Sequence, residues 1–208
     1  MSKRRFLSGL GLLLALILMM PSGGSLAADQ AASPGWAKDI QAGSGQKPAR
    51  NPAWAVPLNL PEADNLYRVS PGLYRSAQPS AAAFREYEKL GIKTVINLRA
   101  RHSDRQLITG TGLKLIEVPI NTWAIDDEDI IRVLGHIKNE AGPVLVHCQH
   151  GADRTGTVMA MYRIIFEGWS KEAALDELRN GGYGYHAVWR NIPKYIRNAD
   201  VKRLKAAL

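Results

Sequence analysis

The sequence predicts a single α/β domain with a central, mostly parallel sheet flanked by helices. Three segments rich in β-branched residues, at 93–98, 113–120 and 144–147, are separated by segments in which apolar residues recur at helical spacing. Strands that alternate with helices in this way usually run parallel. Ligands bind such sheets at the carboxyl ends of the strands, so a site is expected just after residue 147.

The other elements follow from local signals. Two short strands are expected at 67–69 and 72–75, on either side of a turn with the sequence Ser-Pro-Gly. Ser80 and Ser170 are suitable N-caps for two of the helices. Six helices are predicted from apolar spacing and end signals: they span 81–90, 127–141, 155–168, 171–180, 186–197 and 200–207.

The first 28 residues have the pattern of an export signal. The basic residues Lys3–Arg5 precede an apolar run over 6–20, and small residues at 25–27 suit a signal peptidase. The run is shorter than the ~18 residues of a membrane-spanning helix. We therefore expect cleavage after Ala27 or Ala28, a periplasmic location and no stable membrane insertion of the mature chain. An uncleaved N-terminal anchor is the alternative.

The remainder of the chain is long enough for one domain with a sizeable core. Residues 29–60 are rich in Gly, Pro, Ser, Gln and Ala and lack apolar periodicity, so they are interpreted as a linker or a loosely ordered arm. The folded domain is then expected over 61–208.

Charge and cysteine content narrow the class of protein. The formal net charge of +8 includes Lys3–Arg5, so the mature chain is only moderately basic. Basic and aromatic residues do not alternate in a way that indicates a nucleic-acid partner. Cys148 is the single cysteine and has no disulfide partner within the chain, although an exported protein usually pairs its cysteines. Its setting favours a chemical role.

The segment 144–156 reads as a buried strand, a tight loop and a helix start, with five residues between Cys148 and Arg154. Inward-facing backbone N–H groups and a helix N-terminus attract an anion. The same field favours a thiolate at Cys148. The planar guanidinium of Arg154 matches two oxygens of a phosphate. Together these features predict phosphoryl transfer through a phosphocysteine.

The motif His-Cys-x5-Arg-Thr-Gly at 147–156 resembles the signature of cysteine-dependent protein tyrosine and dual-specificity phosphatases. Residues 65–79, 93–99 and 160–169 resemble exported bacterial members of the dual-specificity branch, so the resemblance covers about residues 60–206. It implies a protein tyrosine phosphatase-like fold. It also implies a hydrolase acting on phosphorylated proteins, foremost on phosphotyrosine, with phosphoserine and phosphothreonine as further substrates.

The loop and the resemblance assign roles to individual residues. Cys148 is the expected nucleophile. The resemblance implies that His147 fixes the loop geometry. Thr155 either donates its hydroxyl to the sulfur or simply caps the helix. Residues of the loop are expected to bind the phosphate, mainly through backbone N–H groups: they are Gln149, His150, Gly151, Ala152, Asp153 and Arg154.

The general acid is harder to assign. Such an acid is usually an aspartate on a mobile loop, here within 121–128. Alignment with the resembled phosphatases puts Trp123 where their aspartate is expected. Asp126 is the first candidate because it lies closest to the loop apex, although it could instead cap the following helix. Asp153 is the second, and its alternative role is to orient Arg154.

Some alternatives stay open. The loop has no lysine, which disfavours a highly phosphorylated inositol. The segment 95–99, however, resembles plant and fungal relatives, some of which act on inositol pyrophosphates, so inositol phosphates and phospholipids remain alternative substrates. A phosphoprotein-binding pseudophosphatase would lack Cys148 or Arg154, and a sulfurtransferase would use a shorter loop.

Arg75, which follows a strand, could rim the mouth of the site.

Neither a cofactor nor a metal is expected from this pattern. The run His147-Cys148-x-His150 offers potential ligands, but no second pair stands at a useful spacing. The expected partner is therefore a phosphorylated protein substrate.

Overall fold

The computed structural model describes residues 50–208. The predicted signal peptide and most of the predicted linker lie outside these residues. Within the described range, no helix combines the length and apolar character needed to cross a membrane. The strands are β1 (Val56–Pro57), β2 (Tyr67–Ser70), β3 (Leu73–Ser76), β4 (Thr94–Arg99), β5 (Lys114–Ile120) and β6 (Val144–His147). The helices are α1 (Ala81–Lys89), α2 (Asp127–Asn139), α3 (Asp153–Phe166), α4 (Lys171–Asn180), α5 (Asn191–Asn198) and α6 (Val201–Ala206).

The six strands form one sheet in the order β1-β2-β3-β6-β4-β5. β3, β6, β4 and β5 are parallel, while β1 and β2 add an antiparallel edge. The predicted α/β fold with a mostly parallel sheet is therefore confirmed. β6 lies between β3 and β4, so the loop that follows it emerges from the interior of the sheet.

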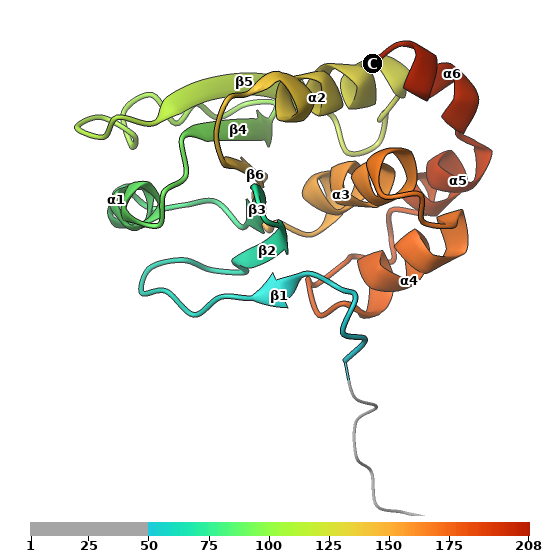
Figure 1. The fold of residues 1–208 in the computed structure, drawn as a ribbon, viewed down its shortest axis with the longest axis horizontal. Coiled ribbons are helices and arrows are strands. Elements are labelled where there is room, and N and C mark those ends of the chain that lie inside the picture. The colour runs from blue at the N-terminus through green and yellow to red at the C-terminus, as the bar shows by residue number, and fades with distance from the viewer. Residues whose placement is uncertain (1–49) are drawn as a thin grey trace, which may run out of the picture. The chain divides into compact units, whose positions relative to one another are not determined.

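The helices divide between the two faces of the sheet. α1 lies on one face, and α3 to α6 gather on the other (Figure 1). Side chains alternate along a strand, so each central strand contributes to both cores. Leu145 packs in the core beneath α1, whereas Val144 and Val146 pack in the core beneath the other helices.

The helix ends follow the predicted capping residues. The Ser80 hydroxyl accepts a hydrogen bond from the Ala83 N–H, and the Ser170 hydroxyl accepts one from Ala173. Gly91 follows α1 with a φ of 93°, a left-handed conformation that glycine adopts readily. Both predicted serine caps are confirmed.

Two predicted helix starts were wrong. α3 begins at Asp153, two residues before the predicted start. α5 begins at Asn191 rather than at residue 186, because the main chain of His186 instead donates a hydrogen bond to the Asp153 carboxylate. Pro193 lies in the first turn of α5, where its missing N–H has no intrahelical partner to lose.

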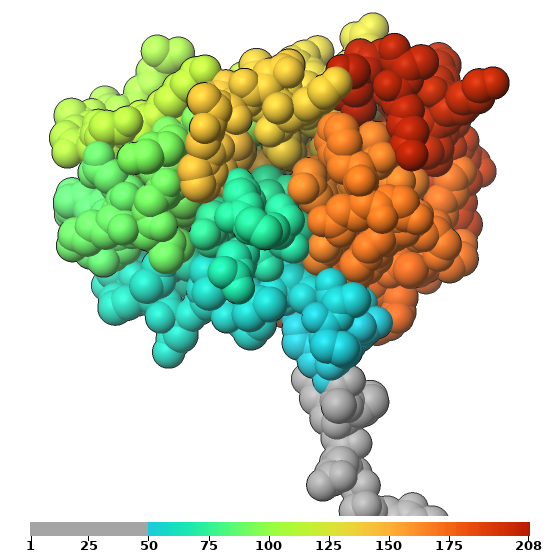
Figure 2. Space-filling view, viewed as in Figure 1, coloured from blue at the N-terminus to red at the C-terminus, as the bar shows by residue number. Residues whose placement is uncertain are grey.

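The folded domain extends further toward the N-terminus than the predicted boundary at residue 61. Residues 56–57 form β1, and the N–H of the buried Ala55 donates to the Glu177 carboxylate at 2.7 Å. In Figure 2 this segment, in blue to cyan, lies directly against the orange atoms of α3 and α4. The described end of the predicted linker is thus part of the domain.

Candidate active site

Cys148 lies at the carboxyl end of β6, where the parallel sheet predicts a ligand site. It is the first residue after the strand, its side chain is only 2% exposed, and it is not in a disulfide. The loop that follows leads directly into α3, whose first residue is Asp153. Cysteine, loop and helix N-terminus therefore have the arrangement expected from the sequence.

The carbonyl oxygens of four successive loop residues, 149–152, each accept a hydrogen bond from a donor on the outer side of the loop. The hydrogen bonds are Gln78 N to Gln149 O (3.1 Å), Asn65 Nδ2 to His150 O (2.7 Å), Arg75 Nη2 to Gly151 O (2.6 Å) and Gly156 N to Ala152 O (2.9 Å). In a planar trans peptide the N–H points opposite to the C=O. The N–H groups of residues 150–153 therefore face the inside of the loop.

These four N–H groups have no hydrogen-bond partner among residues 50–208. Unpaired N–H groups that converge at a helix N-terminus form a site for an anion. The loop is thus built as a cradle for a phosphate-sized group, with the Cys148 sulfur beside it.

Arg75 lies beneath the loop and not at its rim, where it was expected. Its side chain is 1% exposed, and its guanidinium stacks 3.6 Å from the centre of the Tyr183 ring. Burial lowers the pKa of Arg75, opposed by the nearby Tyr183 and Glu177. Because Arg75 binds the Gly151 carbonyl, it fixes the direction of the Ala152 N–H inside the loop.

His147 anchors the strand end from the other side. Its Nε2 lies 2.8 Å from Oδ2 of the fully buried Asp104, and its Nδ1 lies 3.3 Å from the Cys148 carbonyl oxygen. Burial by itself would raise the pKa of Asp104. The contacts with His147 and a hydrogen bond from Gln78 outweigh burial, so this pKa lies below its usual range. Asp104 was missed because its loop has no sequence motif.

Arg154 reaches across the ends of the neighbouring strands. Its Nη1 lies 3.4 Å from the carbonyl oxygen of Leu98 and 3.5 Å from that of Ile120. A cleft of about 300 Å³ opens beside it. Positive and aromatic side chains line this mouth together: they are Arg99, Arg101, Arg154, Trp123 and Trp189.

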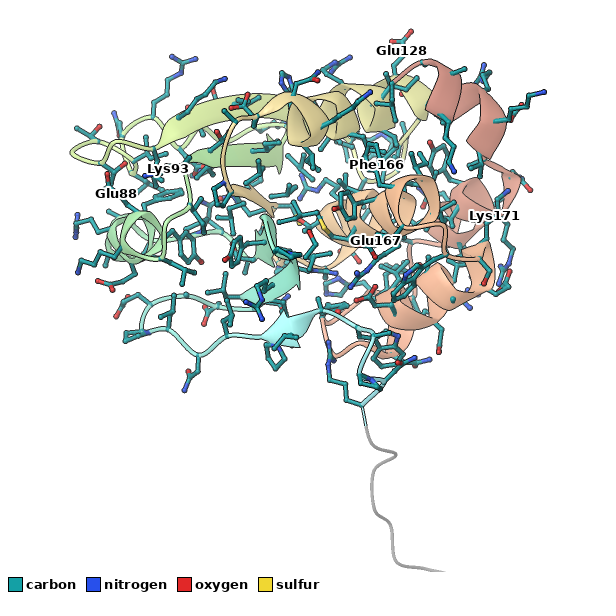
Figure 3. The ribbon with its side chains drawn as sticks, viewed as in Figure 1. Glu88, Lys93, Glu128, Phe166, Glu167 and Lys171 are labelled. Carbon is teal, nitrogen blue, oxygen red and sulfur yellow. The ribbon has the colours of Figure 1, made fainter. Side chains whose placement is uncertain are left out.

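The structure separates the two candidate acids. Asp126 is exposed and caps α2, where its carboxylate accepts a hydrogen bond from the Asp129 N–H. Glu128 projects outward from the same helix start (Figure 3). Asp126 lines a different cleft, shared with α5 and α6, and does not line the mouth beside Arg154. Asp126 is therefore not brought to the site.

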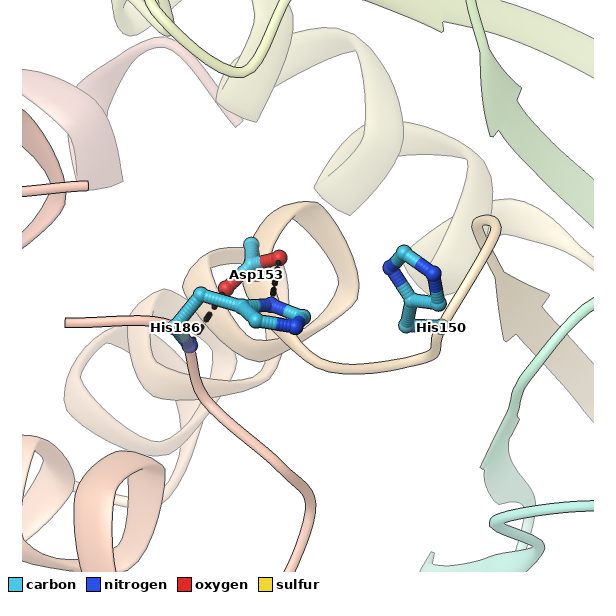
Figure 4. Close-up of side chains that lie close together, drawn as sticks. All are labelled: His150, Asp153 and His186. Carbon is cyan, nitrogen blue, oxygen red and sulfur yellow. Dashed lines mark hydrogen bonds and ion pairs between the residues drawn. The ribbon is translucent and has the colours of Figure 1, made fainter. Parts of the chain in front are cut away.

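Asp153 does belong to the loop, and it has a partner that the sequence did not reveal. Its Oδ1 accepts from the backbone N–H of His186 at 3.0 Å, and its Oδ2 lies 2.8 Å from His186 Nδ1 (Figure 4). His186 comes from the connection between α4 and α5. No spacing pattern links it to residue 153, so only the tertiary structure identifies the pair.

Thr155 is not the helix cap, because Ala152 occupies that position. The Thr155 hydroxyl is buried, and it has no hydrogen-bond partner among the described residues. The Thr155 hydroxyl can therefore form a hydrogen bond with a group in the site.

The fold and the loop define a cysteine-dependent phosphatase, and comparisons with known proteins agree. A family model described as "Polymorphic toxin system, DSP-PTPase phosphatase" matches residues 69–168. The dual specificity protein phosphatase TpbA of Pseudomonas aeruginosa is 39% identical over 161 residues, covering 76% of this chain and 72% of that protein. The chain therefore belongs to the dual-specificity phosphatase family, and it is TpbA-like.

Solved structures extend the similarity. A crystal structure of TpbA matches with a TM-score of 0.69 and 40% identity, covering 76% of this chain and 97% of that one. A cysteine-to-serine variant of TpbA in complex with phosphotyrosine matches with the same TM-score. Among relatives found by sequence, an inositol diphosphatase of Arabidopsis thaliana, DSP4, is 28% identical over 130 residues, covering 58% of this chain and 62% of that protein.

Gly151 is expected to tolerate no side chain. Its φ is 66°, and a Cβ there would lie 2.4 Å from the Ser76 carbonyl oxygen. Gly151→Ala should displace the loop and lower kcat/KM for an aryl phosphate by about 10²-fold, because small misplacements of reacting groups are costly. Gly135→Ala is the matched control, since a Cβ there meets nothing within 4 Å. Equal kinetics for the two variants would contradict the close fit of the loop.

Proposed function

We propose that this chain hydrolyses phosphotyrosine in proteins through a phosphocysteine intermediate. The proposal rests on one observation: a buried cysteine beside a loop whose unpaired N–H groups face inward, next to an arginine. Trp123 and Trp189 at the mouth suit an aromatic leaving group. The phosphotyrosine complex of the relative supports the same substrate class.

In the proposed reaction, the Cys148 thiolate attacks phosphorus and the bond from phosphorus to the leaving oxygen breaks. Arg154 and the loop N–H groups bind the non-bridging oxygens as charge shifts onto them. The leaving oxygen takes a proton from the Asp153–His186 pair. Water then attacks phosphorus and gives a proton to the Asp153–His186 pair, which restores the acid. The bond between phosphorus and the Cys148 sulfur breaks, the thiolate departs, and inorganic phosphate is released. The free hydroxyl of Thr155 eases this second step by donating to the sulfur.

The two predicted acids give a matched test. A general acid acts in its protonated form, so its loss removes the decline of kcat on the alkaline side of the pH profile. Asp153→Asn should lower kcat for phosphotyrosine about 10²-fold and have a smaller effect on p-nitrophenyl phosphate, whose leaving group needs less protonation. Asp126→Asn should match the parent, because asparagine also caps helices. A large loss of kcat in Asp126→Asn, with none in Asp153→Asn, would show that Asp126 is the general acid.

The direct test is to stop turnover of a phosphotyrosine peptide with acid and map the phosphate by mass spectrometry. Phosphate on the peptide that contains Cys148, together with release of inorganic phosphate without added metal, is the expected result. Turnover without any phosphorylated cysteine would contradict the proposed intermediate.

A second substrate class is favoured by a specific feature of the mouth. Arg99 and Arg101 lie beside Arg154, so a substrate with more than one phosphate could be held there. The similarity to an inositol diphosphatase agrees with this. Measuring turnover of an inositol pyrophosphate under the same conditions distinguishes the two substrate classes. We expect the phosphotyrosine peptide to have the higher kcat/KM.

We also propose that the protein acts in the periplasm. The basic and apolar pattern of the first 28 residues supports export. Cell fractionation with N-terminal sequencing of the mature protein tests this, and a start at Ala28 or Asp29 is expected.

A further inference from the structure

Two residues of the phosphate loop and one from a distant segment bring potential metal ligands together. His150 and Asp153 belong to the loop, and His186 precedes α5; one ligand atom from each lies within 4.8 Å of the others (Figure 4). We propose that this cluster binds a zinc-type divalent metal ion, and that the bound ion inhibits the enzyme. The inhibitory part rests on the proposed phosphatase function, while the binding part stands without it.

The geometry is close to that of a three-ligand site. Asp153 Oδ2 and His186 Nδ1 are already 2.8 Å apart, and the two imidazole rings lie edge to face with centroids 5.1 Å apart. Zinc bonds of about 2.0–2.1 Å in a tetrahedral arrangement place neighbouring ligand atoms roughly 3.3–3.5 Å apart. Both imidazoles are exposed and can rotate, so a shift of about 1 Å closes the site around an ion.

One ligand is held in place before any ion arrives. The Asp153 side chain is 9% exposed, and its Oδ1 accepts the His186 backbone N–H. This hydrogen bond is the kind of outer contact that orients metal-binding carboxylates in proteins. It leaves Oδ2 directed toward the His186 ring, so the buried carboxylate needs no rearrangement.

The donor set selects the class of metal. Two imidazoles and one carboxylate suit Zn²⁺, Co²⁺ or Ni²⁺, whereas Mg²⁺ and Ca²⁺ prefer oxygen ligands alone. Three protein ligands leave one tetrahedral position open to water. The sequence did not predict this site because only His150 and Asp153 lie close together in the chain. His147, the other histidine of the motif, contacts Asp104 and does not belong to the cluster. The second histidine comes instead from a segment 33 residues beyond Asp153.

Binding would have a direct consequence for the reaction. A metal on His186 Nδ1 and Asp153 Oδ2 takes the place of the proton that these atoms share. The pair could then no longer protonate the leaving group. The ion would also tie the connection before α5 to the phosphate loop, since two of its ligands are loop residues.

Calorimetric titration of the full-length protein with Zn²⁺, in buffer free of phosphate and chelators, tests the site. One ion per chain is expected, with affinity at least ten-fold weaker in His150→Ala and in His186→Gln. The glutamine amide can still donate a hydrogen bond to Asp153, so a folding defect is avoided. His136→Ala, on α2, is the matched histidine control and should bind as the parent does. Mg²⁺ should not bind.

Cys148→Ser separates this site from the catalytic thiol. The serine variant should keep its zinc affinity, because the sulfur is not among the proposed ligands. Loss of binding in Cys148→Ser, no binding by the parent, or equal binding by the parent and both histidine variants would each overturn the site. None of these outcomes depends on catalysis, so failure of the proposed function would be recognised separately.

The inhibitory role has its own measurement. Zn²⁺ should inhibit turnover by the parent at the concentrations at which it binds, and a chelator should restore activity. His150→Ala, measured relative to its own turnover without zinc, should need at least ten-fold more Zn²⁺ for half inhibition, because it lacks one of the three ligands. Stoichiometric binding at the histidines with unchanged turnover would overturn the inhibitory role.

Discussion

Replacing Cys148 by serine is expected to lower kcat by about 10⁴-fold or more while phosphotyrosine binding persists. A serine hydroxyl is ionised far less readily than a thiol, so the nucleophile is lost. The inward N–H groups and Arg154, which we propose bind the phosphate, are untouched by the change. A cysteine-to-serine variant of the relative TpbA has been captured with phosphotyrosine, in line with this separation.

Phosphate release and calorimetric binding of a phosphotyrosine peptide, measured on the same Cys148→Ser preparation, check this prediction. Arg154→Lys is the comparison: a point charge replaces a planar two-point donor, so binding and turnover should both fall. Persistent turnover by the serine variant would show that another group is the nucleophile. Loss of peptide binding by that variant would show that the sulfur itself holds the substrate.

The fold was predictable wherever one segment carries its own signal. β6 is a run of β-branched and aliphatic residues, α1 has a serine cap and a terminating glycine, and α2 presents Ile130 and Val133 to the core. The start of α5 was not predictable in this way. Residues 186–190 contain the apolar Val188, which suggests a helical face, yet this side chain is 77% exposed. Their conformation depends instead on the contact of His186 with Asp153.

The same distinction applies to the site. Cys148 and Arg154 were predicted because one contiguous loop holds both. Arg75 reaches the loop because β3 pairs in parallel with β6, placing it opposite Val146, and no local pattern specifies this register. The prediction for Asp126 was wrong for a related reason. Its position close to the loop apex favoured a catalytic role over a capping role, but in the structure its carboxylate caps α2.

Glu177→Gln is expected to destabilise the protein by about 3–5 kcal/mol, because it breaks a buried ion pair. The Glu177 side chain is 6% exposed, and its carboxylate accepts hydrogen bonds from Arg163 Nε (2.9 Å), the Tyr183 hydroxyl (2.8 Å) and the Ala55 N–H (2.7 Å). It thereby joins α3, α4 and the N-terminal segment. Tyr183 also stacks on Arg75, which holds the phosphate loop.

The pH dependence follows from the charge of this group. Burial alone would raise the pKa of Glu177, but hydrogen bonds and the charge of Arg163 outweigh it, so the pKa in the folded protein lies below the usual 4.5. A lowered pKa stabilises the fold above the unfolded-state pKa, and that stabilisation is lost as the pH falls through the folded-state value.

Urea unfolding of the parent and Glu177→Gln should therefore differ by a constant free energy at neutral pH and down to about pH 5, with a smaller difference at lower pH. Glu172→Gln removes the exposed pair with Arg197 and should leave the midpoint unchanged, which makes it the matched control. A difference for Glu177→Gln that does not shrink in acid would mean that the hydrogen bonds, and not the charge, stabilise this part of the domain. In that case the glutamine amide fails because its NH2 group cannot accept the hydrogen bonds that the second carboxylate oxygen accepts.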